Sequence, residues 1–179
     1  MVILRPTRKI RQLSTEPLDP EAVSDTALGD WYANRIVIDR QPLLLLISSL
    51  SLLPLLIRAR DVRRLPTRLP EVLGVRLRRI GIPSEVVKSE VEAMRPVIIG
   101  TTVDRSVLGS LVDFAKSVPY YLPEVGWDEG SLWKAEDLLA ETPCRVARRS
   151  EDVIFPRDKT PELLKEKWSQ TPPGSTSLN

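Results

Sequence analysis

The stretch WYANRIVIDRQPLLLLISS, residues 31–49, decides the fold of this chain. In an extended chain successive side chains point to opposite faces. Residues 31–39 therefore form a strand with Trp31, Ala33, Arg35, Val37 and Asp39 on one face and Tyr32, Asn34, Ile36 and Ile38 on the other. Residues 39–42 form a turn, and residues 43–49 return as a second strand. Because this second strand is apolar without interruption, we expect it at the centre of the sheet.

The rest of the chain adds strands and helices around this hairpin. Strands are predicted over residues 2–5 and 96–103, and the apolar run 43–57 is interpreted as a strand plus the start of a connection. Helical spacing, caps and breakers predict helices over 70–80, from 84, from 104 or 106 to about 118, within 127–141, and from 160. This order predicts an α+β fold, a largely antiparallel sheet of three or four strands with helices packed on one face. We expect one domain over residues 1–168 and a disordered tail over 169–179.

The composition narrows the chemistry open to the chain. It contains no histidine and a single cysteine, Cys144. Catalysis by Ser-His-Asp or Cys-His pairs, HExxH zinc sites, an internal disulfide and multi-cysteine metal sites are therefore excluded. We expect no metal and no cofactor. The apolar run after Met1 is too short for a signal peptide and the run 43–57 too short to span a membrane, so we expect a cytoplasmic protein without a membrane role.

One arginine stands where an apolar residue is expected. In the predicted helix over 70–80, Arg76 falls in the middle of an apolar arc made by Leu69, Val72, Leu73, Leu77 and Ile80. An unpaired buried guanidinium is costly, so Arg76 must either reach solvent or meet an anion. Two interpretations stay open, namely a structural ion pair, with Asp39 or Asp113 as partner, and a site for an anionic ligand.

The predicted helix that begins near residue 104 has a face of small and acidic residues. This face collects Ser106, Gly109, Ser110, Asp113 and Ser117, opposite an apolar arc. It is compatible with a solvated face that packs tightly at Gly109, with a polar ligand site in which Asp113 is the charged member, or with a catalytic carboxylate at Asp113.

Basic residues are concentrated in the first part of the chain. Residues 1–80 hold 14 Lys or Arg against 8 Asp or Glu, whereas residues 81–179 hold 12 against 16. The densest group comprises Arg58, Arg60, Arg63, Arg64 and Arg68. A basic surface suits the phosphates of a nucleic acid, but no aromatic residues interleave with these arginines as stacking on single strands would require. A solvated basic face and an acidic protein partner are the alternatives.

Several motifs resemble those of one protein family. LGDWYAN (28–34), IDR (38–40) and DRSVLGSLVDF (104–114) together resemble an uncharacterised bacterial domain family, and TPC (142–144) with FP (155–156) is similar to its C-terminal extension. The resemblance covers roughly residues 1–168, implies a bacterial origin and assigns no activity. Its family-like positions are Trp31, Asn34, Asp39, Arg40, Arg105, Ser106, Gly109, Asp113 and Phe114.

Three functional hypotheses follow. The first is a non-enzymatic binding or regulatory module that recognises a protein or a small anionic ligand. Its predicted site residues are Trp31, Asn34, Asp39, Arg40, Arg76, Arg105, Ser106, Ser110 and Asp113. The second is nucleic-acid binding by the arginines of residues 58–68. The third is an enzyme that works through carboxylates and arginines, which requires Asp113 to share a hollow with Arg76, Arg105 or Asp39.

Overall fold

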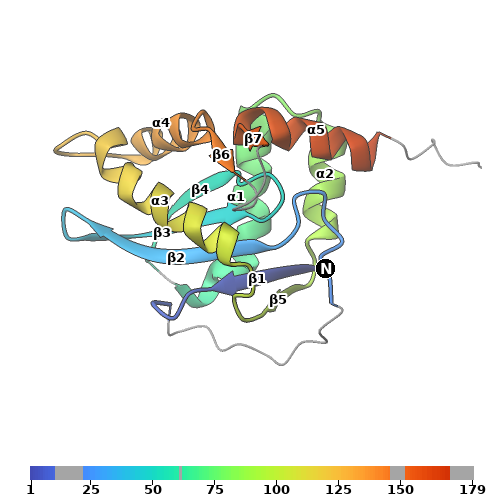
Figure 1. The fold of residues 1–179 in the computed structure, drawn as a ribbon, viewed down its shortest axis with the longest axis horizontal. Coiled ribbons are helices and arrows are strands. Elements are labelled where there is room, and N and C mark those ends of the chain that lie inside the picture. The colour runs from blue at the N-terminus through green and yellow to red at the C-terminus, as the bar shows by residue number, and fades with distance from the viewer. Residues whose placement is uncertain (11–21, 61, 146–151, 170–179) are drawn as a thin grey trace, which may run out of the picture.

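A five-stranded sheet forms the centre of the molecule, with strand order β4-β3-β2-β1-β5 (Figure 1). The computed structural model describes residues 1–10, 22–60, 62–145 and 152–169. Strands β2, β3 and β4 are antiparallel neighbours, and β1 runs parallel to both β2 and β5. Most paired residues of the sheet are therefore antiparallel, and the predicted combination of helices with such a sheet is confirmed. The strands are β1 (Val2–Pro6), β2 (Trp31–Ile38), β3 (Gln41–Ser48), β4 (Pro54–Arg58) and β5 (Val97–Ile99).

The predicted hairpin is the β2–β3 pair. Its register joins Trp31 to Ser48 and Ile38 to Gln41, so only Asp39 and Arg40 remain to form the turn. Both have positive φ, at 49° and 63°, as a two-residue turn of the mirror-image class requires. The predicted alternation of faces is also confirmed, since Trp31 and Ala33 enter one core and Tyr32 and Ile38 the other.

The sheet has one strand more than the prediction of three or four. The interpretation of residues 50–57 as a connection is wrong, because β4 follows β3 directly and pairs with it from Leu43–Arg58 to Ile47–Pro54. Pro54 cannot donate a backbone hydrogen bond, which argued against a strand. However, it is the first residue of an edge strand, where a missing donor costs little. Leu52, with φ of 58°, allows the tight reversal before it.

The prediction that helices pack on one face of the sheet is wrong. Figure 1 shows α3 in front of the strands and α1 behind them. One core joins Leu44 and Leu46 of β3 to α1, α2 and α5, and the other joins Leu43, Leu45 and Ile47 to α3 and α4. The helices are α1 (Leu65–Arg79), α2 (Ser84–Ala93), α3 (Arg105–Tyr121), α4 (Glu129–Ala140) and α5 (Pro156–Trp168); the 3₁₀ turn η1 is Val62–Arg64, and β6 (Cys144–Arg145) pairs with β7 (Val153–Ile154).

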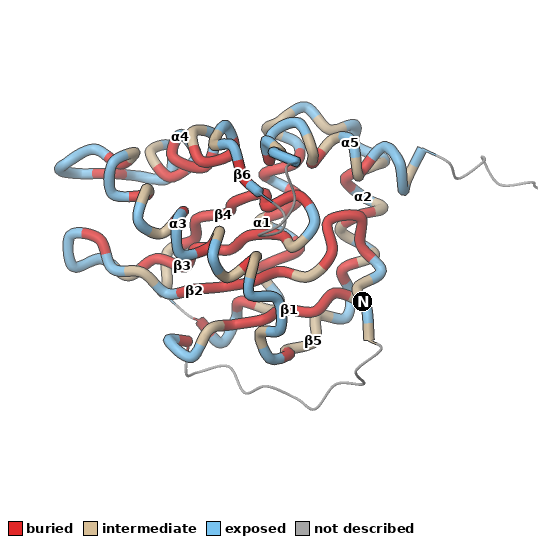
Figure 2. Tube along the Cα trace, in the orientation of Figure 1, coloured by how far each residue is buried: buried red, intermediate tan, exposed pale blue. Residues whose placement is uncertain are grey.

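The physical reason for two helical layers lies in β3 itself. Residues 43–47 are all apolar and all but fully buried, as the red central strands of Figure 2 show. Because side chains alternate between faces, such a run removes apolar surface from water only when both faces are covered. The strand β3 was predicted at the centre of the sheet and lies inside it, but second from the edge, since β2 holds the central position. A single helical layer is incompatible with the burial of both its faces.

Two helix boundaries test the prediction of caps. Asp104 caps α3, because its carboxylate accepts hydrogen bonds from the backbone N–H groups of Ser106 and Val107. In contrast, α5 begins at Pro156 and not at Thr160. The Thr160 hydroxyl is buried and donates to the hydroxyl of Ser51 at 2.9 Å, so it ties α5 to the turn before β4. The predicted tail over 169–179 lies, apart from Ser169, outside the described residues.

A buried carboxylate links α2 and α5, which lie on the same face of the sheet as α1. Glu90 on α2 is completely buried and accepts hydrogen bonds from the backbone N–H groups of Ala27 and Leu28 and from the indole N–H of Trp168. One side chain therefore joins α2, the segment before β2 and the end of α5. Burial raises the pKa of Glu90 above its ordinary value of 4.5, although these three hydrogen bonds oppose the rise.

This raised pKa predicts a specific dependence of stability on pH. Between pH 4.5 and the raised value the folded state retains a proton that the unfolded chain releases, so the free energy of unfolding falls as the pH rises through this window. We expect Glu90→Gln, which cannot titrate, to make this fall shallower in urea unfolding at a series of pH values. Glu92→Gln, an exposed position on the same helix, is the control and should keep the wild-type slope. Equal slopes for wild type and Glu90→Gln would contradict the prediction.

Candidate anion-binding site

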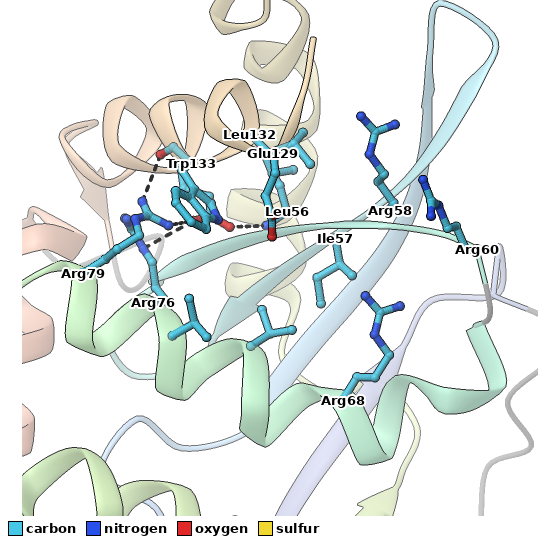
Figure 3. A pocket seen from close by; sticks show the side chains of 13 residues that line it. Leu56, Ile57, Arg58, Arg60, Arg68, Arg76, Arg79, Glu129, Leu132 and Trp133 are labelled. Carbon is cyan, nitrogen blue, oxygen red and sulfur yellow. Dashed lines mark hydrogen bonds and ion pairs between the residues drawn. The ribbon is translucent and has the colours of Figure 1, made fainter. Parts of the chain in front are cut away.

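A pocket of about 310 Å³ lies at the free edge of β4, between α1 on one face of the sheet and α4 on the other (Figure 3). Five arginines line it: Arg58 and Arg60 from the end of β4 and the residues after it, and Arg68, Arg76 and Arg79 from α1. Figure 3 shows Arg76, Arg79 and Trp133 at one end of the pocket and Arg58, Arg60 and Arg68 at the other. The end with Arg76, Arg79 and Trp133 is called the closed end below, because its arginines are ion-paired, and the other end is called the mouth.

Ion pairs neutralise the closed end. Arg76, 2% exposed, pairs with Asp137 and has its Nε 3.7 Å from the Glu136 carboxylate. Arg79 donates to Glu136 at 3.0 Å and to Asp137 at 3.1 Å, and its guanidinium lies 4.7 Å from the centre of the Trp133 ring. The expectation that Arg76 is neutralised by a carboxylate is therefore confirmed, whereas the proposed partners, Asp39 and Asp113, are wrong. The true partners come from α4, which covers the same sheet edge.

Glu136 joins the ion pairs to the backbone of the sheet. Its Oε1 accepts the backbone N–H of Leu56 at 2.8 Å, and its Oε2 faces the two arginines. Because β4 is an edge strand, this N–H has no partner strand and would otherwise be buried unpaired. Desolvation raises the pKa of Glu136, opposed by the Leu56 N–H and the arginines. Glu136 therefore closes the strand edge and the inner end of the pocket together.

At the mouth, Arg58 is held by neutral groups. It donates to the side-chain oxygen of Gln41 at 2.8 Å and to the backbone carbonyl of Trp127 at 3.0 Å, and it lies 4.6 Å from the centre of the Trp127 ring. These contacts fix the direction of the guanidinium without cancelling its charge. Since a guanidinium has five N–H donors, three remain for a ligand.

Arg60 and Arg68 complete the mouth. Neither forms an ion pair within the part of the chain that the structure describes. Glu129, at the start of α4, is the acidic residue that lines the pocket besides Glu136. Among the described residues that line this end, three arginines stand against one exposed glutamate, so positive charge is in excess.

The two remaining arginines of the basic group lie elsewhere. Arg63 and Arg64 are exposed on η1, and neither lines the pocket. The five arginines were grouped because they are close along the chain, and the structure divides them into three that line the pocket and two on the outer surface. Nucleic-acid binding stays a prediction, and this division supplies a way to test it.

The predicted polar face of α3 lines a second, more open hollow of about 950 Å³. Arg105, Ser106, Ser110 and Asp113 lie along it, with Gly109, Phe114 and residues 142–145. Asp113 therefore shares a hollow with Arg105, but its side chain is exposed and lies 3.5 Å from Lys116. Cys144, at the far wall, is buried, and burial raises the pKa of its thiol to about 11, as expected for a small buried apolar residue.

The hairpin residues do not join this hollow. Trp31 is fully buried in the core, and Asn34 is buried with its amide oxygen bonded to the Thr7 hydroxyl at 2.8 Å. Asp39 and Arg40 are exposed at the hairpin tip. The structure therefore separates the predicted site residues into core, hairpin tip, α3 hollow and, for Arg76, the arginine pocket.

Sequence reasoning missed Arg79, Trp133 and Glu136. Arg79 follows Arg76 by three residues, so the two lie on neighbouring turns of one helix. The acidic pair Glu136-Asp137, which neutralises both arginines, lies in the helix predicted within 127–141. This helix was not predicted next to α1 at the edge of the sheet, because a single layer of helices was expected.

Among the described residues, no helix is both long and apolar enough to cross a membrane. In the same parts of the chain, no group of three or more histidine, cysteine or acidic side chains is arranged to hold a metal ion.

One family model matches the chain, over residues 3–159, and its description reads domain of unknown function (DUF6933). The predicted resemblance to a family without an assigned activity is confirmed. No curated protein and no solved structure gives a match. Both the arginine pocket and the α3 hollow lie within the matched residues.

The ion pairs at the closed end predict a large stability effect. Arg76→Met removes one charge and leaves the buried Glu136 with fewer partners, so we expect a loss of roughly 3–5 kcal/mol in the free energy of unfolding. Adding Glu136→Gln removes the stranded charge, and the double variant should lose less than the sum of the two single losses. Urea unfolding measures all three, with Arg78→Met on the exposed side of α1 as the control. Additive losses would show that the two side chains do not interact.

Proposed function

Because the chain belongs to the DUF6933 family, whose description names no activity, we propose a function from the pocket itself: the protein is a binding module for a small anionic ligand. The ligand is held at the mouth by Arg58, Arg60 and Arg68. The single observation that carries this proposal is that three arginines line the same end of the pocket and have no carboxylate partner among the described residues.

The contrast between the two ends of the pocket supports the proposal. Arg76 and Arg79 show how this fold neutralises arginines that serve structure: it brings two acidic residues from α4. At the mouth α4 brings only Glu129, and Arg58 receives uncharged partners instead. Like charges that converge without compensation repel one another, and an anion between them removes that repulsion.

Geometry favours a small ligand over a long polyanion. The three arginines line one end of a pocket of about 310 Å³, which is at the lower end of the range for small-molecule sites. Guanidinium groups bind carboxylates and phosphates through paired N–H donors, and such charge-assisted hydrogen bonds are stronger than neutral ones. A nucleic acid would instead need positive charge spread along an outer surface.

We predict that Arg58→Gln and Arg68→Gln each weaken the binding of pyrophosphate by about tenfold, the equivalent of one lost charge-assisted hydrogen bond. Amide NMR shifts at constant ionic strength measure this, and for the wild type the shifts should centre on β4, α1 and the start of α4. At 20.2 kDa the protein is well suited to this measurement.

Arg63→Gln is the matched control, because it removes the same charge from an exposed position outside the pocket. It should leave pyrophosphate binding unchanged. The proposal fails if pyrophosphate at millimolar concentration moves no pocket signals in the wild type, or if the Arg63 variant loses as much affinity as the pocket variants. The second result would favour the nucleic-acid hypothesis, which makes no distinction between these arginines.

A further inference from the structure

The middle of the arginine pocket is apolar, and this narrows the ligand class beyond its charge. Between the mouth and the closed end, Ile57 of β4, Val72 and Val75 of α1 and Leu132 of α4 line the pocket. Figure 3 shows Ile57 between Arg76 and Arg68, facing the space enclosed by β4 and α1. An anion held only at the mouth would leave this surface uncovered.

Val75 is the clearest sign that the apolar surface is accessible. This residue lines the pocket and is 42% exposed, so a ligand in the pocket can contact it. Ile57 and Leu132 are almost completely buried by the protein, so they form the floor. Covering Val72 and Val75 with an apolar group would release water from both surfaces at a gain in free energy, whereas placing a charged group there would cost the hydration of that charge.

The closed end limits how far a ligand extends. Arg76, Arg79, Glu136 and Asp137 bond one another, and the indole of Trp133 packs against Arg79. A second charge on the ligand would have to break these ion pairs, which an apolar end leaves intact. The pocket therefore offers a ligand positive charge at the mouth and apolar surface in the middle.

We propose that the ligand is a phosphate monoester with a compact apolar body, the size of one ring or a short alkyl chain. This inference rests on the proposed function and deepens it. The phosphate carries close to two negative charges at neutral pH and accepts charge-assisted hydrogen bonds, so it suits an end of the pocket that arginines line without carboxylate partners among the described residues. The apolar body lies on Val72 and Val75, toward Leu132.

Comparing phenyl phosphate with methyl phosphate tests this directly, because the two share the charged group and differ in the apolar body. At pH 7.5 and constant ionic strength, phenyl phosphate should bind the wild type at least about tenfold more tightly, since the ring removes apolar surface from water. Titrations followed by amide NMR give both dissociation constants. Val72→Thr preserves the shape of the side chain and adds a hydroxyl group, so it should reduce this ratio without changing methyl phosphate binding.

The outcomes separate the two proposals. Equal affinity for the two esters, with both lost in Arg58→Gln, would overturn the phosphate monoester with an apolar body and leave the small-anion site standing. Tighter binding of phenyl phosphate that Val72→Thr does not reduce would place the ring elsewhere and also overturn it. Failure of every anion, pyrophosphate included, would overturn the proposed function itself. Arg63→Gln should bind both esters as the wild type does.

Discussion

The structure depends on one constraint, which is that five consecutive apolar residues of a strand have to be buried on both faces. Residues 43–47 point alternately to the two cores, and this forces one set of helices to each side of the sheet. As a result α1 and α4 lie on opposite faces and both reach the free edge of β4. The arginine pocket is the space between them at that edge. A single layer of helices would bury only half of β3 and would leave no such space.

At two places in this fold, a buried carboxylate accepts hydrogen bonds from backbone N–H groups that have no partner in a strand or helix. Glu136 accepts the unpaired N–H of Leu56 at the strand edge, and Glu90 accepts the N–H groups of Ala27 and Leu28 before β2. In each case an acidic residue of a helix satisfies backbone donors that no strand or helix can reach. The difference is that Glu136 is also paired with arginines, whereas Glu90 receives an indole N–H. Both links join a helix to the sheet region, so the layers are positioned by polar contacts as well as by packing.

What the sequence could predict was local. The hairpin, the cap at Asp104 and the oddity of Arg76 follow from alternation, capping and the cost of a buried charge, and all three are present in the structure. Strand β4 was missed because Pro54 seemed to mark the boundary of an element. At the start of an edge strand, however, the missing N–H of a proline costs no hydrogen bond within the sheet. The site was found only in part, because Arg58, Arg60 and Arg68 were noted for their number and not for a shared pocket. Whether they share a pocket depends on which helices cover which face of the sheet, and the predicted single layer of helices gave the wrong answer.

The two ends of the pocket illustrate why buried charge and functional charge require different surroundings. Arg76 is almost fully desolvated, so it must be neutralised within the protein, and it then has little left to offer a ligand. Arg58 is partly buried, and its partners are an amide, a carbonyl and an aromatic ring, so no carboxylate among these partners compensates its charge. Under the proposed function, an anion at the mouth would supply the negative charge that Arg58, Arg60 and Arg68 lack among the described residues. A carboxylate in place of the Gln41 amide would neutralise Arg58 within the protein, so it would make the fold more stable and the mouth less suited to an anion.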